Sequence, residues 1–156
     1  MGESRGAKKK RNWGEKWPRG FRGSLTRWGE TLDRLEELAG IVVDAALEVH
    51  RALGPGFPEG AYEQALAVEL ELRGIPFQCQ VPIAIKYKGF DIGEGRLDLL
   101  VEDSLIVELK ATESLAPVHV AQVVSYLRAT HHHLGLLINF NVRLLKQGLR
   151  RVVLSR

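Results

Sequence analysis

The sequence predicts an α/β fold in which helices pack on a mixed central sheet. Patterns typical of helices and strands follow one another in the order helix, helix, three strands, helix, strand. A helix that crosses over between two strands implies a mixed sheet covered by helices. The last long strand, "LGLLINF" at 134–140, is apolar throughout. Such a run is expected of a strand that is buried on both faces and paired in parallel.

The 156 residues divide into a basic arm, 1–30, and one domain, 31–156. Residues 1–28 hold nine lysines and arginines against two acids, a net +7, which leaves −4 for the rest of a chain with net charge +3. No apolar run approaches the roughly 20 residues that span a bilayer, and the start lacks the apolar centre of a secretory signal. A single cysteine cannot form an internal disulfide. We therefore expect a cytoplasmic protein that does not enter a membrane.

The arm has two interpretations. Its basic run comprises Lys8, Lys9, Lys10 and Arg11. This run could bind phosphates without sequence preference, while the three tryptophans of the arm stack on bases. Alternatively, the arm is a solvated tail or an over-extended start of translation.

Two amphipathic helices are expected before the strands. The first extends from about Thr31 to Leu53, where apolar residues recur at i, i+3 and i+4, and "GPG" at 54–56 ends it. The second extends from Pro58 to about Arg73, with Gly74 as its C-terminal cap. The apolar stripe of the second helix is expected to comprise Ala61, Tyr62, Ala65, Leu66, Val68 and Leu72.

The remaining elements follow from alternation and turn residues. Lys88 and Gly89 turn the first strand into the second, and Pro117 suits the first turn of the third helix. The expected strands are 80–88, 91–101, 105–111 and 134–140, the third helix is 116–130, and an edge strand is expected at 149–154.

Charged residues interrupt the apolar hairpin "RLDLLVEDSLIVELKA". Alternation places Glu108 and Lys110 on one face and Asp98 on the face of Leu100. A three-residue turn at 102–104 would pair Leu99 with Val107, and Asp98 with Glu108, with Cβ atoms about 4.5–5.5 Å apart. Two carboxylates that are buried this close require positive charge. The group is therefore either a structural ion-pair cluster with Lys110 or a site for Mg²⁺ or Mn²⁺.

Two helices offer further candidates. Glu59 begins the second helix, three residues before Tyr62 and on the same face, so it could be a third carboxylate ligand. It could equally complement the helix dipole. Gln122 and Tyr126 share a face of the third helix, and Tyr126 is a candidate for contact with nucleic acid. Gln122 could contact a phosphate or a water on the metal, or it could be an ordinary solvated residue.

Histidines are weaker candidates. His50, near the end of the first helix, either lines the cleft or packs in the core, and Tyr62 of the second helix is another possible cleft residue. His119 precedes Gln122 by three residues and could lie near the same site. The run 131–133 of three histidines is read as a helix end, because adjacent side chains cannot all face one metal.

With these residues identified, the chain resembles the GxxExxY proteins, which are placed in the PD-(D/E)XK nuclease-like superfamily. "GFPEGAY" at 56–62 matches the G-x-x-E-x-x-Y signature, and the resemblance extends through "VPIAIKYKG", "PVHVAQVVSYL" and "LLINFNV" over about 31–154. Asp98, Glu108 and Lys110 match the D…E-x-K pattern. Glu59 matches an acid of the first core helix, and Gln122 with Tyr126 matches Q-x-x-x-Y.

The resemblance implies a restriction-endonuclease-like core, α-β-β-β-α-β, and Mg²⁺-dependent cleavage of phosphodiesters. Asp98, Glu108 and the Leu109 carbonyl would hold the metal, with Glu59 as an outer or third ligand. Lys110 and Gln122 would assist catalysis. DNA is favoured over RNA as substrate, and a homodimer is one assembly that the superfamily suggests. The alternative is a catalytically inactive module that binds nucleic acid or protein.

Overall fold

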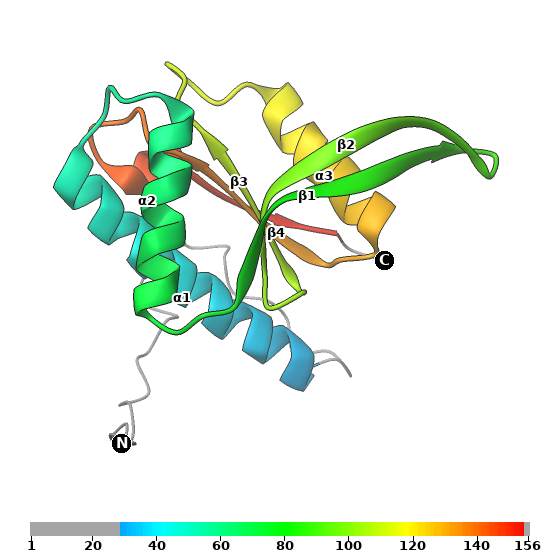
Figure 1. Cartoon of the computed structure of the whole chain (residues 1–156), viewed down its shortest axis with the longest axis horizontal. Helices are drawn as coiled ribbons and strands as arrows, with labels where there is room; N and C mark the ends of the chain where they lie inside the picture. Colours follow the sequence, from blue (N-terminus) through cyan, green and yellow to red (C-terminus); the bar gives the residue numbers. More distant parts are fainter. Residues whose placement is uncertain (1–28, 155–156) are drawn as a thin grey trace.

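The structure, a computed structural model, describes residues 29–154 (Figure 1). The basic run Lys8, Lys9, Lys10 and Arg11 lies outside the described residues, so its role stays a prediction. The elements are α1 (Gly29–Leu53), α2 (Glu59–Leu72), β1 (Phe77–Tyr87), β2 (Phe90–Val101), β3 (Leu105–Lys110), α3 (Pro117–Thr130), β4 (Leu134–Asn139), the 3₁₀ helix η2 (Leu145–Gly148) and β5 (Leu149–Val153). The predicted order is therefore confirmed, with the first helix beginning two residues earlier than expected.

The five strands form one mixed sheet in the order β1-β2-β3-β4-β5. The neighbours β1/β2, β2/β3 and β4/β5 are antiparallel, whereas β3 and β4 are parallel. All six residues of β4 are buried. This agrees with the apolar run that predicted a central strand in parallel pairing.

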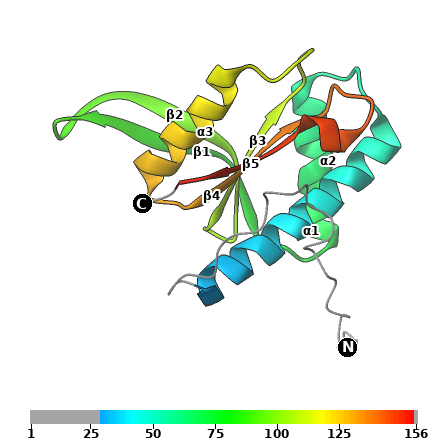
Figure 2. The ribbon, with the colours of Figure 1, turned by 180° about the vertical axis from the view of Figure 1, so that it is seen from behind.

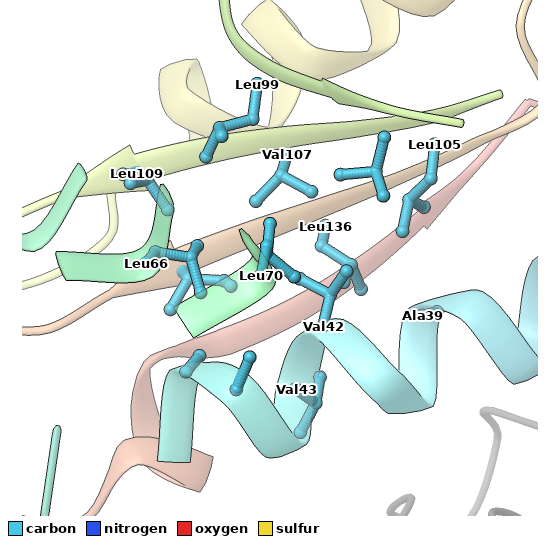
Figure 3. Close-up of a cluster of buried hydrophobic side chains, with 14 of the residues drawn as sticks. Ala39, Val42, Val43, Leu66, Leu70, Leu99, Leu105, Val107, Leu109 and Leu136 are labelled. Atoms are coloured by element: carbon cyan, nitrogen blue, oxygen red, sulfur yellow. The ribbon is translucent and has the colours of Figure 1, made fainter. Parts of the chain in front are cut away.

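Helices cover both faces of the sheet (Figure 2). The larger core lies between one face and the helices α1 and α2, and Figure 3 shows Val42, Leu66 and Leu70 directed toward Val107 and Leu136 of the sheet. A smaller cluster on the other face contains Val123 and Leu127 of α3. Helices packed on the two sides thus bury both faces of the central strands β3 and β4.

The stripe predicted for α2 is partly wrong. The helix buries Tyr62, Leu66 and Leu70, which are spaced by four residues, whereas Val68 and Leu72 are 56% and 78% exposed. Residues spaced by four lie on one side of a helix, and here that side meets the sheet. The cap prediction is confirmed, because Gly74 has a φ of 69° and its N–H donates to the Glu71 carbonyl at 2.9 Å.

The hairpin of β1 and β2 projects beyond the rest of the sheet (Figures 1 and 2). Its two-residue turn is Lys88-Gly89, as predicted, and both residues have positive φ, as a type I′ turn requires. At the root of the hairpin, by contrast, β1 contacts α2 and β2 pairs with β3. Among residues 29–154, no helix has the length and apolar character needed to cross a bilayer.

Candidate active site

The site lies where β2 and β3 separate. The two strands pair from Val101↔Leu105 through Leu100↔Ile106 to Leu99↔Val107. This is the register that the three-residue turn predicted. The pairing then stops, and the next residues on the two strands are Asp98 and Glu108. The gap between the strands therefore opens at the two acids.

Side chains take the place of the missing ladder bonds. The backbone N–H of Leu109 donates to Asp98 Oδ2 at 2.8 Å, and the backbone N–H of Asp98 donates to Glu108 Oε1 at 3.2 Å. Each carboxylate thus accepts a hydrogen bond from the backbone of the other strand. The sequence predicted that the acids are neighbours, and these two crossed bonds bring them together in the gap.

Strict alternation along β2 fails at Asp98. Leu99 packs in the cluster under α1 and α2, whereas Leu97 packs with Leu100 in the cluster under α3. Residues two apart would share a face in a regular strand. The regular alternation on which the placement of Asp98 on the Leu100 face rested therefore does not hold between Leu97 and Leu100. Here the Asp98 N–H donates to Glu108 of β3, and the Asp98 carboxylate, which accepts from the Leu109 N–H, points into the gap between the strands.

Glu108 is buried, with 3% of its surface exposed. Burial, and next the negative charge of Asp98, raise the pKa of Glu108 to about 8, although Lys110 opposes the shift. Near neutral pH this carboxyl therefore retains a proton in the absence of added positive charge. The charge of Lys110 alone does not compensate both acids, which weighs against the interpretation as a self-sufficient ion-pair cluster.

Glu59 lies at the start of α2 and is exposed. Partial burial of its carboxyl and the charge of Asp98 raise its pKa, and the charge of Lys110 acts in the opposite direction. Glu59 therefore lies close enough to the β2–β3 gap for the charges of Asp98 and Lys110 to affect its pKa. However, residues 29–154 contain no group of three or more His, Cys, Asp or Glu side chains arranged to hold a metal. A ligand role for Glu59 remains a prediction.

The oxygen donors of the gap suit a divalent cation. Asp98 and Glu108 supply two carboxylates that repel each other, and a cation could replace the proton that Glu108 retains. The Leu109 N–H faces Asp98. Because the N–H and C=O of one strand residue point to the same neighbour, the Leu109 carbonyl also faces the gap. Hard oxygen donors of this kind match Mg²⁺ or Mn²⁺.

The α3 candidates lie on one helix but do not bond to the acids. Gln122 Nε2 donates to the Tyr126 hydroxyl at 3.1 Å. His119 Nδ1 accepts from the Ala116 N–H at 2.9 Å, so it closes the first turn of α3. The contact of Gln122 with a phosphate stays a prediction.

Gly95 of β2 lies against Tyr126 of α3 and Ile83 of β1. A Cβ atom at Gly95 would lie 3.0 Å from Tyr126 Cε1 and 3.1 Å from Ile83 Cγ1. The Tyr126 ring therefore occupies the space beside Gly95. A large side chain at this position would require Tyr126 and Ile83 to move.

The histidine run and His50 have structural partners. His131 ends α3 in the left-handed conformation with φ of 58°, which confirms that 131–133 mark a helix end. His50 Nε2 lies 2.8 Å from the Val142 carbonyl, and its ring is 6.5 Å from that of Phe140. His50 thus packs against the segment that follows β4.

Tyr62 has no exposed surface, so it supports the site from within the core rather than lining an open cleft. Its ring stacks on Phe140 with centroids 4.6 Å apart. Its hydroxyl donates to the Gly54 carbonyl at 2.6 Å and accepts from the Phe57 N–H at 3.2 Å. Tyr62 thereby holds the loop that leads into Glu59 at the start of α2.

Replacing Tyr62 with phenylalanine is expected to lower the free energy of unfolding by about 1–3 kcal/mol, because the loop groups lose their buried partner. Urea unfolding monitored by circular dichroism measures this loss. Tyr87→Phe is the matched control, since Tyr87 is 60% exposed and should change stability by less than about 0.5 kcal/mol. Equal midpoints for the two variants would contradict the role given to the Tyr62 hydroxyl.

Sequence reasoning missed two residues at this site. Gln80 Nε2 donates to Glu63 Oε1 at 2.7 Å and to Asp98 Oδ1 at 3.4 Å. The spacing of Glu63, four residues after Glu59 on the same helix face, was an available signal. Nothing in the strand pattern distinguished Gln80 from its exposed neighbours.

Comparison with known proteins identifies a family. The family model described as PD-(D/E)XK nuclease superfamily matches residues 36–152, about three quarters of the chain. The matched range contains both acids of the β2–β3 gap, Lys110 and the α2 residues beside them. No curated protein and no solved structure matches the chain.

Proposed function

The chain belongs to the PD-(D/E)XK nuclease superfamily, and from that premise we propose that it is a metal-dependent nuclease. The observation that carries the proposal is the pair of crossed hydrogen bonds that joins Asp98 and Glu108 at the gap between β2 and β3. Two acids held this close, with Lys110 two residues further along β3, form a compact site for a cation and a phosphate. The G-x-x-E-x-x-Y segment at 56–62 favours the GxxExxY branch of the superfamily.

In the proposed mechanism Asp98, Glu108 and the Leu109 carbonyl would hold Mg²⁺ or Mn²⁺, with Glu59 as an outer or third ligand. When bound, the cation would supply Lewis-acid polarisation of the phosphate and would lower the pKa of a water molecule. The Lys110 ammonium orients the attacking water or stabilises charge that develops on the phosphate oxygens. Gln122 donates from its amide to a phosphate oxygen and so positions the scissile group.

The substrate is proposed to be nucleic acid, with DNA favoured over RNA. The acids of the gap would repel a polyanion unless a cation is bound, so substrate binding at the site should depend on metal. The basic run from Lys8 to Arg11 would offset this repulsion without sequence preference. A homodimer and a cytoplasmic location complete the proposal.

A cleavage panel tests the function. Labelled single-stranded, duplex and branched DNA and the matching RNAs are incubated with Mg²⁺, Mn²⁺ or EDTA. Cleavage of at least one substrate is expected with metal and not with EDTA. Lys110→Ala should reduce it by about 100-fold or more, whereas Lys146→Ala, at an exposed lysine of η2, should not.

Cleavage that persists in EDTA, or that is equal in the two lysine variants, would contradict the assignment. If no substrate is cut, the alternative function, a catalytically inactive binding module, is favoured. That module would still bind nucleic acid or a protein, and deletion of residues 1–28 should weaken its binding of nucleic acid.

A further inference from the structure

Gln80 connects two acids that come from different elements. Its side-chain amide donates to Glu63 Oε1 of α2 at 2.7 Å and to Asp98 Oδ1 of β2 at 3.4 Å. A single NH₂ group carries two hydrogens, so it can serve both acceptors at once. Gln80 is therefore an uncharged donor placed between two negative charges.

The backbone at Gln80 is unusual for its residue type. Its φ is 53°, in the left-handed region that glycine enters freely and other residues enter at a cost. It lies between the ladder pairs Cys79↔Leu99 and Val81↔Leu97, opposite Asp98. The backbone conformation by itself would favour glycine at this position, so it does not explain why a glutamine is present. The hydrogen bonds of the glutamine amide to Glu63 and Asp98 explain it.

Both oxygens of the Asp98 carboxylate are thereby held. Oδ2 accepts from the Leu109 N–H at 2.8 Å, and Oδ1 accepts from Gln80. Hydrogen-bond donors at both oxygens fix the χ angles of a carboxylate. The side chain is then already oriented before a ligand binds. Glu63, through its shorter bond, anchors the Gln80 amide to α2.

We propose that Gln80 is a positioning residue, which orients the Asp98 carboxylate for the cation and links it to Glu63 of α2. The inference rests on the proposed function, because it assumes that Asp98 binds a divalent cation. It assigns Gln80 no contact with metal or substrate. Partners in the outer shell of a metal site contribute about 10–100-fold in metal affinity, so losing the amide should weaken binding by roughly this factor.

Two variants separate orientation from folding. Gln80→Ala removes the amide but keeps a β-carbon in the left-handed conformation, whereas Gln80→Gly removes the amide and relieves the backbone. Mn²⁺ affinity is measured by isothermal titration calorimetry on the full chain, and stability by urea unfolding without metal. Gln78→Ala is the matched control, since Gln78 is an exposed glutamine on the same strand.

The expected result is that Gln80→Ala and Gln80→Gly both weaken Mn²⁺ binding by about 10-fold or more. Gln80→Gly should do so while unfolding at the same or a higher urea concentration than the wild type, which a purely structural role would not produce. Gln78→Ala should bind like the wild type.

Wild-type Mn²⁺ affinity in both Gln80 variants would overturn the inference while leaving the proposed function standing. Weakened binding in Gln80→Gly together with unfolding at lower urea than the wild type would also overturn it, since the loss would then follow from folding. If the wild type itself binds no Mn²⁺, or if Asp98→Ala binds as tightly as the wild type, the proposed function fails and the inference fails with it.

Discussion

Asp98→Asn is expected to abolish Mg²⁺-dependent cleavage while leaving the fold intact. The asparagine Oδ1 can still accept the hydrogen bond from the Leu109 N–H that Asp98 accepts at 2.8 Å. The negative charge that would hold the cation is lost, however. Because Asp98 would contact the metal directly, the substitution should reduce activity by more than the roughly 10–100-fold that is typical for residues of the outer shell of a metal site. Steady-state cleavage rates and circular dichroism measure the two effects separately.

Asp98→Ala should be equally inactive, because it too lacks the charge. It also relieves the repulsion that Asp98 exerts on Glu108, which should limit any loss of stability. Asp33→Asn is the control, since Asp33 is an exposed acid on α1. An Asp98→Asn protein that cleaves at the wild-type rate would refute the assignment of Asp98 to the metal. An Asp98→Asn protein that does not fold would show that the charge itself is structural.

The metal-free protein is expected to lose stability as the pH rises from about 5 to about 8. Burial and Asp98 raise the pKa of Glu108 from 4.5 to about 8, so in this range the folded chain keeps a proton that the unfolded chain has released. The folded state binds more protons, and the free energy of unfolding therefore falls with increasing pH. The loss should be on the order of a few kcal/mol and should be complete above pH 8.

Glu108→Gln removes this titration, so it should be more stable than the wild type at pH 8 and nearly equal to it at pH 5. Urea unfolding at the two pH values, with EDTA present, measures the difference. Adding Mg²⁺ at pH 8 should stabilise the wild type, because a ligand that binds only the folded state favours it, and should not stabilise Glu108→Gln. Identical pH profiles for the two proteins would show that Glu108 is not a high-pKa carboxyl.

Much of the fold could be predicted because it depends on local spacing. Strand alternation and a three-residue turn were sufficient for the pairing of Leu99 with Val107, and a one-residue slip would have exposed the apolar face. The stripe of α2 was less well determined. Several of its residues are apolar, and only the position of the sheet selects Leu70 for burial over Leu72.

The sequence by itself determined the order of elements, the register at the hairpin and the closeness of Asp98 to Glu108. These follow from side-chain periods of two and 3.6 residues, which act over a few positions. Only the tertiary structure decided that β2 and β3 separate at the acids and that Asp98 points into the gap. It also decided that Gln80 reaches both Asp98 and Glu63. The contacts of Gln80 with Glu63 and Asp98 join residues that are 17 and 18 positions apart in the sequence. They form where β2 departs from regular alternation, and no periodic pattern in the sequence specifies such a departure.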